Sequence, residues 1–279
     1  MDDRSSKTLR LLGGAEMPVL GLGTYPLDNE QVEPVVGRAL ELGYRLFDTA
    51  ESYGNEVGVG RALEASGIDR SELFVTTKFN ARWHGEDLVR EAFQRSAERL
   101  RLERIDQLMI HWPNPARGRF VDAWRGLIRL RDEGLVRSIG VANFKPHHLQ
   151  RLLDETGVAP DVNQIELNPF ADRSAVRAFH EEHEIATEAW APLGKGGELL
   201  DDPVIADIGE RHGRTPAQVV LRWSLQLGNV VIPKTKRRER LLENFSVFDF
   251  TLAANEMEAI EALSRGERAV TLDSDEFGH

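Results

Sequence analysis

Short apolar runs rich in β-branched residues recur along the chain at a nearly even stride, and most precede a segment with helical periodicity. The eight runs begin at residues 19, 44, 73, 105, 136, 162, 185 and 229. Two clear helical segments are 86–100 and 121–134, and the second stops at Gly134, as a helix commonly does. Alternating strand and helix units favour a parallel sheet, and eight of them predict an α/β fold, a closed (β/α)8 TIM barrel. A doubly wound open sheet is the alternative.

The remaining segments predict one domain, 1–279. Residues 1–18 carry the stretch LRLLGGAEMP, which favours an N-terminal β-hairpin with Gly13 and Gly14 at its turn. No linker or low-complexity tract interrupts the units, and we expect residues 264–279 to form a C-terminal tail that contributes a substrate loop.

Composition narrows the class of protein. The 46 acidic and 35 basic residues give a net charge of −11, which argues against a nucleic-acid partner. The chain has no cysteine, so disulfides and thiolate-held metals are excluded, and we predict no metal site. The N-terminus is acidic where a signal peptide is basic, and no apolar run reaches the roughly 18 residues of a membrane span. We expect a soluble cytoplasmic protein without a membrane partner.

Ionisable residues follow consecutive strands at the end where a barrel enzyme carries its active site. Asp48 ends the second run, with Tyr53 in the loop after it; Lys78 ends the third, and His111 ends the fourth. Each has a structural explanation: a helix cap, a packed loop ring, a solvated lysine or a core histidine. Together they predict a proton-donating site.

These groups suit protonation of an alkoxide while hydride arrives at a carbonyl carbon. A tyrosine with its ordinary pKa of about 10 is a weak acid at neutral pH. A neighbouring lysine ammonium favours the phenolate, and a carboxylate holds that lysine charged. The histidine can orient the carbonyl oxygen.

Motifs throughout the chain resemble those of the aldo-keto reductases, in particular the prokaryotic group that includes the 2,5-diketo-D-gluconate reductases. The motifs are GLGTY (21–25), FDTAESYGNE (47–56), TTK (76–78), IHWP (110–113), SIGVANF (138–144), NQIELNP (163–169), APLGKG (191–196) and IPKTKRRERLLENFSVFDF (232–250). The resemblance implies NADPH-dependent reduction of an aldehyde, ketone, dicarbonyl or keto-sugar. It also implies a monomer whose catalytic residues are Asp48, Tyr53, Lys78 and His111, with Tyr53 as general acid.

Apart from the resemblance, one group of residues indicates a cofactor site. GLGTYP is no dinucleotide fingerprint, because Pro26 stands where the third glycine belongs. A basic cluster at the junction of the eighth strand and its helix suits a phosphate, although it equally suits a solvated helix face. The cluster consists of Lys234, Lys236, Arg237, Arg238 and Arg240.

The resemblance assigns the cofactor contacts in two groups. At the adenosine end, Lys234, Thr235 and Arg240 would bind the 2′-phosphate. The residues around the adenine would be Ile232, Lys236, Glu243 and Asn244. At the nicotinamide end, the contacts would be Gly23, Thr24, Asp48, Asn143, Gln164, the stacking Trp190, and Leu193 and Gly194 along the pyrophosphate.

Three positions depart from the family pattern. Ala142 replaces a common serine, which removes one hydrogen bond to the carboxamide. Thr235 keeps the hydroxyl of the more usual serine. Trp190 replaces a common tyrosine and offers a larger stacking face.

The substrate pocket is expected to be aromatic. Its walls would come from the loops after the first four strands and from the tail, through Tyr25, Trp83, Trp112 and Phe277, with His111 at the base. Trp83 equally suits loop packing.

Two other functions fit parts of the pattern. The same fold can bind NADPH as a regulatory or sensor module with little turnover. Lys78 also suits a Schiff-base aldolase, in which the basic cluster would bind a substrate phosphate.

Overall fold

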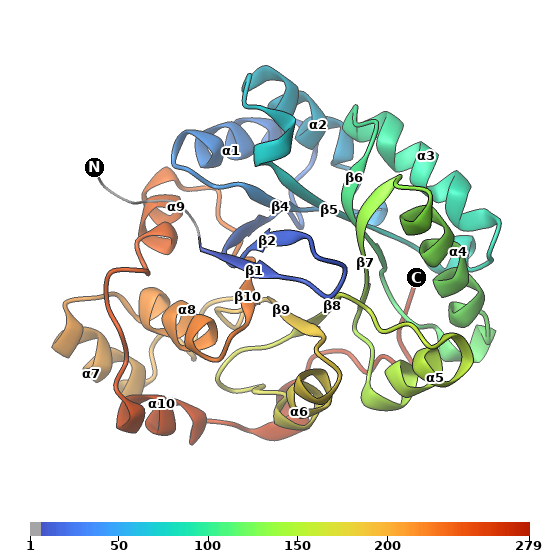
Figure 1. The fold of residues 1–279 in the computed structure, drawn as a ribbon. Helices are drawn as coiled ribbons and strands as arrows, with labels where there is room; N and C mark the ends of the chain where they lie inside the picture. The colour runs from blue at the N-terminus through green and yellow to red at the C-terminus, as the bar shows by residue number, and fades with distance from the viewer. Residues whose placement is uncertain (1–6) are drawn as a thin grey trace.

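The computed structural model describes residues 7–279, without the side chains of residues 267 and 268. Eight parallel strands form one sheet in sequence order. They are β3 (Gly21–Gly23), β4 (Leu46–Asp48), β5 (Phe74–Phe79), β6 (Ile105–Ile110), β7 (Val136–Ala142), β8 (Val162–Glu166), β9 (Ala186–Trp190) and β10 (Val230–Val231). The sheet closes where Val231 N donates to Val19 O at 2.9 Å and Leu20 bridges to Val231. The fold is therefore the predicted (β/α)8 barrel and not the open sheet (Figure 1).

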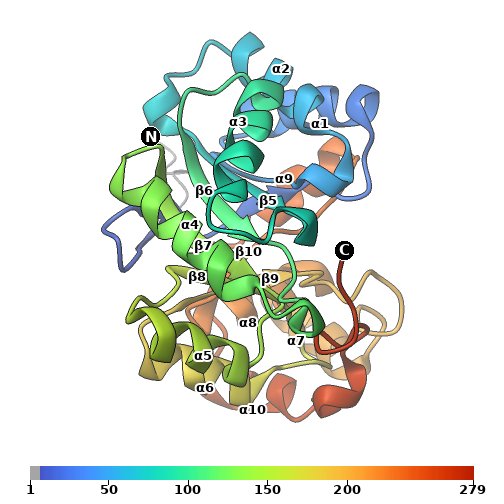
Figure 2. The ribbon, with the colours of Figure 1, turned by 90° about the vertical axis from the view of Figure 1, so that its right-hand side faces the viewer.

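Helices surround the barrel and bury its outer face (Figures 1 and 2). The helices of the eight units are α1 (Asn29–Glu41), α2 (Glu56–Ala65), α3 (Leu88–Leu100), α4 (Phe120–Asp132), α5 (Pro146–Thr156), α6 (Ser174–Glu182), α8 (Pro216–Gln226) and α9 (Arg238–Phe245). Two further helices are α7 (Pro203–His212) and α10 (Ala254–Glu261). Short 3₁₀ turns are η1 (Glu51–Tyr53), η2 (Arg70–Glu72), η3 (Ala81–Trp83), η4 (Pro115–Arg117) and η5 (Gly266–Ala269). Helix α4 ends as predicted, with Gly134 at a φ of 75° just beyond its cap residue Glu133.

The N-terminal hairpin closes one end of the barrel. Strands β1 (Thr8–Arg10) and β2 (Glu16–Pro18) pair antiparallel, and Gly14 takes a φ of 83° at the turn, as expected for glycine. Residues 1–6 of the predicted hairpin lie outside the described residues. Apolar side chains of the hairpin pack against inward-facing side chains at the strand starts. The hairpin contributes Leu11, Ala15 and Met17, and the strands contribute Leu46, Phe74, Val162 and Val230. Access to the interior is therefore from the opposite end.

Strand periodicity positions the polar groups at that opposite end. Successive side chains on a strand point to opposite faces, so Phe47 and Phe79 join the core between sheet and helices, whereas Asp48 and Lys78 point into the barrel. The interior is apolar near the hairpin and becomes polar toward the strand ends. No helix in the described part of the chain is long and apolar enough to span a membrane.

Candidate active site

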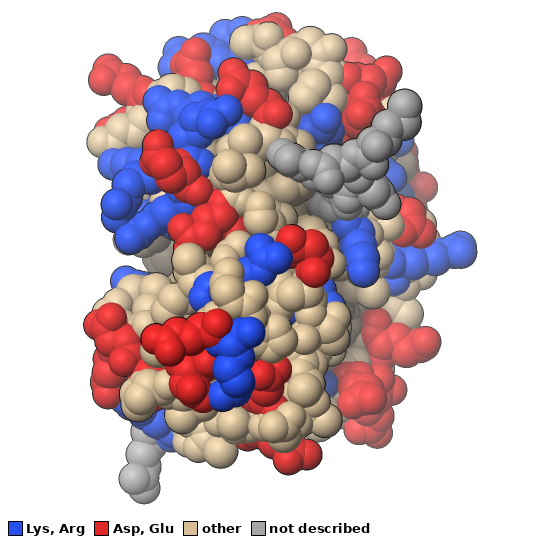
Figure 3. Space-filling view, turned by 90° about the vertical axis from the view of Figure 1, so that its left-hand side faces the viewer, with Lys and Arg blue, Asp and Glu red and all other residues tan. Residues whose placement is uncertain are grey.

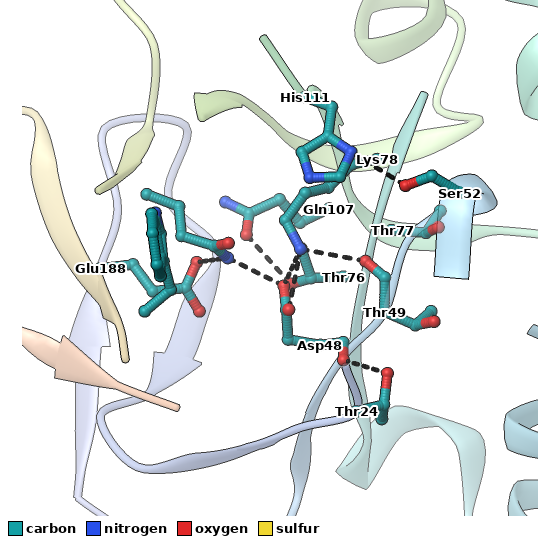
Figure 4. A network of polar contacts seen from close by, with 12 residues as sticks. Thr24, Asp48, Thr49, Ser52, Thr76, Thr77, Lys78, Gln107, His111 and Glu188 are labelled. Atoms are coloured by element: carbon teal, nitrogen blue, oxygen red, sulfur yellow. Dashed lines mark hydrogen bonds and ion pairs between the residues drawn. The ribbon is translucent and has the colours of Figure 1, made fainter. Parts of the chain in front are cut away.

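A buried ion pair lies at the centre of the barrel mouth (Figure 4). Lys78 Nζ donates to Asp48 Oδ1 and Oδ2 at 2.8 and 2.7 Å and to Thr49 O at 3.0 Å. The Lys78 side chain is fully buried and that of Asp48 is 3% exposed. Because an ammonium has three N–H groups, these contacts occupy all of them. Burial opposes the charge of Lys78, but Asp48, Tyr53 and Glu188 together outweigh it and raise the lysine pKa above its usual value.

Tyr53 lies beside this pair on the turn η1. Gly54 ends the turn with a φ of 66°, and the Asn55 side chain ties the segment down by accepting from Thr49 Oγ1 at 2.6 Å and donating to Leu27 O at 2.8 Å. Lys78 Nζ is 5.2 Å from the centroid of the Tyr53 ring. The anchoring role of Asn55 was absent from the sequence prediction, although the Gly-Asn pair is a typical turn signal.

The acidity of Tyr53 differs from expectation. Desolvation raises the pKa of Tyr53 above 10, while the Lys78 ammonium lowers it and the Asp48 carboxylate raises it again. The predicted effect of the lysine is present, but the sequence could not reveal that burial would outweigh it. Tyr53 is therefore a phenol at neutral pH, the form that a proton donor requires.

His111 completes the predicted group of four. Its ring centroid is 5.7 Å from that of Tyr53, in an edge-on arrangement, and its Nδ1 is 3.4 Å from Ser52 Oγ. Desolvation, then the charges of Lys78 and His279, hold the pKa of His111 well below its usual value. The imidazole is neutral at pH 7 and carries one N–H donor.

Gln164 and Glu188 extend the polar group across the barrel. Gln164 Nε2 donates to Asp48 Oδ2 and to Glu188 Oε2, each at 2.8 Å. Burial raises the pKa of Glu188 to about 8, and the Asp48 charge adds to the shift. The sequence prediction included Gln164 but missed Glu188, which lies within the apolar β9 run.

Asn143 follows the end of β7, and Trp190 is the last residue of β9, two strands further along the sheet. Trp190 Nε1 donates to Asn143 Oδ1 at 2.8 Å, and Asn143 Nδ2 donates to His111 O at 3.1 Å. These bonds orient both the amide and the indole. Ala142 is completely buried, and its methyl group offers no hydrogen bond.

The basic cluster begins where β10 ends. Lys234, Arg237, Arg238 and Arg240 are exposed and have no ion-pair partner among the described residues. The face of the molecule that carries α9 displays a gathering of Lys and Arg side chains interspersed with acidic ones (Figure 3). Unpaired cations beside a helix start can bind a phosphate.

The other members of the predicted adenosine site are buried or hydrogen-bonded to side chains of the same chain. Lys236 Nζ donates to Gln31 Oε1 at 2.9 Å, and Glu243 Oε1 accepts from Thr215 Oγ1 at 2.6 Å. Thr235 and Asn244 are buried, as is Ile232. These residues shape the surroundings of the cluster more than its charge.

Four predicted cofactor residues lie at the end of β3 or on loops near the mouth. A Cβ on Gly23 would lie 2.8 Å from Ile232 O, so only glycine fits at this close approach. Thr24 Oγ1 donates to Asp48 O at 2.9 Å. Leu193 and Gly194 lie in the loop after β9, and Gly194 has a φ of 60°.

Aromatic residues and the tail surround the mouth. Tyr25 is 63% exposed with its ring 5.1 Å from that of Tyr53, and Trp112 packs edge-on to Phe277 at 4.7 Å. The final residue, His279, lies 4.9 Å from the His111 ring and accepts from Ala81 N at 2.8 Å. This contact was not predicted from the sequence.

Trp83 differs from the other aromatic residues proposed to bind substrate. It is 8% exposed, and its indole N–H is 3.0 Å from both carboxylate oxygens of Glu51. The side chains of Arg82 and Arg95 lie over its ring. These contacts fit the packing alternative given above.

A cavity of about 380 Å³ lies between the tail and the barrel. Asn143 and Trp190 line one side of it, and Val270, Leu272 and Ser274 of the tail line the other. The tail thus forms part of the wall around the site.

Comparison with known proteins agrees with this geometry. Residues 19–265 match the model of the aldo/keto reductase family. Methylglyoxal reductase DkgA of Salmonella typhimurium is 48% identical over 97% of this chain and 98% of its own length. The 2,5-diketo-D-gluconic acid reductase B of a Corynebacterium species is 48% identical over 93% of this chain and 94% of its own. A crystal structure of a Gox0644 mutant in complex with NADPH is 45% identical, with a TM-score of 0.93 over 98% of this chain and 99% of that one.

The family match spans nearly all of the barrel, and its relatives are similar over almost their whole length. The chain belongs to the aldo/keto reductase family.

Proposed function

We propose that this protein reduces a carbonyl compound to the alcohol with NADPH, and that Tyr53 donates the proton. The observation that carries the proposal is the buried Lys78–Asp48 pair beside Tyr53 at the open end of the barrel. The NADPH-bound relative supports the choice of cofactor.

Each residue has a distinct part in the proposed reaction. NADPH, when bound, supplies hydride to the carbonyl carbon. Tyr53 gives its phenolic proton to the oxygen, and the Lys78 ammonium stabilises the phenolate that remains. Asp48 keeps Lys78 charged and fixed, and the neutral His111 orients the carbonyl oxygen through its N–H.

The chain's own groups fit the cofactor. The exposed Lys234 and Arg240 would hold the 2′-phosphate. Gln164 has both N–H groups committed to carboxyl oxygens, so its own oxygen remains to accept from the nicotinamide amide. Asn143 and Trp190, already oriented by their mutual bond, would complete the nicotinamide pocket.

The Schiff-base alternative is disfavoured by the state of Lys78. A nucleophilic amine must be neutral, whereas this ammonium donates three hydrogen bonds and has a raised pKa.

A small dicarbonyl or keto-sugar is the substrate class that we infer. Relatives named for methylglyoxal and for 2,5-diketo-D-gluconic acid support this class. Tyr25 and Trp112 would provide the apolar wall of the pocket. We further infer a monomer, since the proposed site is complete within one chain, and a cytoplasmic location, with which a cysteine-free sequence is compatible.

The test is Tyr53→Phe, which keeps the ring and removes the proton. Turnover of a dicarbonyl should fall by at least the roughly 100-fold that is typical of losing a general acid, while NADPH still binds. NADPH absorbance measures turnover, and quenching of tryptophan fluorescence measures binding. A variant that retains more than a tenth of wild-type turnover excludes Tyr53 as the donor, and a wild type that binds NADPH without turnover favours the regulatory module.

A further inference from the structure

Glu188 is a buried carboxyl group that the proposed mechanism does not use. It lies on β9 directly opposite Gln164 of β8 in the register of the sheet, and its side chain points into the barrel (Figure 4). Its Oε2 accepts from Gln164, but its Oε1 is buried without a hydrogen-bond partner in the described part of the chain. Burying a carboxylate oxygen without a hydrogen-bond donor lowers the stability of the folded protein.

Glu188 and Asp48 differ in their contacts with the Lys78 ammonium. The barrel interior holds two carboxyl groups and one ammonium near one another, and Lys78 gives all three of its N–H groups to Asp48 and Thr49. No cation among the described residues forms an ion pair with Glu188. A second carboxylate so close to Asp48, without a cation of its own, favours protonation of Glu188.

The same contacts fix the direction of the Gln164 amide. A single amide atom lies 2.8 Å from one oxygen of Asp48 and 2.8 Å from one oxygen of Glu188. The Asp48 carboxylate can only accept, so the Gln164 atom that contacts it must be the NH₂ group. A protonated Glu188 then accepts from the same NH₂ group with Oε2 and carries its proton on Oε1, and the amide oxygen of Gln164 faces the other way.

We propose that Glu188 is a positioning residue, which orients the Gln164 amide and through it supports both the Asp48–Lys78 pair and the carboxamide of the cofactor. The inference rests on the proposed function, because the site that it positions is the one that reduces the carbonyl. When the Glu188 carboxyl is neutral, it still accepts the hydrogen bond from Gln164, and Asp48 is the one negative group of this network that attracts Lys78. Ionised Glu188 adds a second negative charge to the network, which weakens the hold of Asp48 on Lys78.

The groups that face Glu188 set the pH at which this happens. Burial and then the Asp48 charge raise the pKa of its carboxyl, the Gln164 bond and Lys78 lower it, and the net result is a pKa of about 8. Tyr53 and Lys78, the nearby groups with higher ordinary values, both have raised pKa values and titrate above this range. A change near pH 8 therefore identifies Glu188.

Glu188→Gln is the informative variant, because an amide copies the shape and neutrality of the protonated acid. At pH 7 it should bind NADPH within about twofold of wild type. Above pH 8 the wild-type dissociation constant should rise about tenfold, whereas the variant should show no such rise. Glu188→Met removes the acceptor and should weaken NADPH binding about tenfold at every pH.

A matched control is Glu166→Gln on the neighbouring strand, where the carboxyl contacts the tail residue Thr271 at 2.7 Å. This variant should keep the change near pH 8. An identical alkaline change in Glu188→Gln, or wild-type affinity at all pH values in Glu188→Met, would overturn the proposal.

One readout is independent of the cofactor and of turnover. Infrared difference spectra should show the carbonyl stretch of a protonated carboxylic acid in wild type at pH 7, with loss of that band near pH 8 and its absence in Glu188→Gln. A missing band overturns the inference even in an active reductase. A present band in an inactive protein leaves Glu188 neutral as inferred and counts only against the proposed function.

Discussion

Burial of the Lys78 ammonium lowers the stability of the fold, but the same charge serves the proposed reaction at Tyr53. A fully buried ammonium is stable only with a carboxylate partner, and Asp48 supplies two oxygens to it. The pair holds a fixed positive charge beside a phenol that burial alone would make a poor acid. Removing either partner leaves the other charge uncompensated.

We predict that Lys78→Met and Asp48→Asn each nearly abolish carbonyl reduction, and that the double variant is little worse than either single one. Residues that act as a unit give such non-additive losses. Single-turnover rates with NADPH measure the effect on chemistry, and circular dichroism checks that each variant folds. Losses that multiply across the double variant would show two independent residues.

At the scale of elements, the end of β10 and the start of α9 carry the proposed phosphate site. The exposed cations there have no acidic partner among the described residues, although the chain as a whole carries a net charge of −11. A guanidinium can hold a phosphate with paired, charge-assisted hydrogen bonds. The proposed site would give this helix a role in addition to burying Leu241 and Phe245 in the core.

Arg240→Ala should therefore raise the NADPH dissociation constant by about 10- to 100-fold and leave that of NADH nearly unchanged, because only NADPH has the 2′-phosphate. The loss should shrink at high salt, where charges are screened. Tryptophan fluorescence titrations measure both constants. Arg90→Ala on α3 is a control with the same change of charge, and parallel weakening of both cofactors in Arg240→Ala would assign the arginine to loop support.

Across the whole molecule, buried histidines link stability to pH. Desolvation lowers the pKa of His84 and His148 to about 4 and that of His180 to about 3. The unfolded chain binds protons at these residues below a pH of about 6.5, whereas the folded chain does not. Stability should be full above that pH and decline as the pH falls toward 4.

For His180 alone, the ordinary pKa of about 6.5 implies a loss of about 2 kcal/mol at pH 5 relative to pH 7.5. Urea unfolding at the two pH values measures it. His180→Gln should be less stable at pH 7.5, because His180 bonds to Asn163 and Thr187, but should lose less on acidification. His147→Gln, at an exposed position on α5, is the control; an unchanged acid loss in His180→Gln would contradict the assignment.

Much of this organisation follows from local sequence, and some does not. Strand periodicity and strand ends were enough to predict that Asp48, Lys78 and His111 share one mouth. Glu188 was missed because its importance depends on register with Gln164, 24 residues earlier, which an apolar run does not reveal. The pKa of Tyr53 depends on burial, and the path of the tail depends on packing between segments far apart in the chain.

The path of the tail has a practical consequence for handling this protein. A side chain at Gly278 would overlap the Asn114 amide, and the ring of the next residue, His279, lies 4.9 Å from that of His111. Any affinity tag or fused domain added after His279 would thus begin at the mouth of the proposed active site. The hairpin at residues 8–18 covers the opposite, closed end of the barrel, so fusions are better joined to the beginning of the chain (Figure 2).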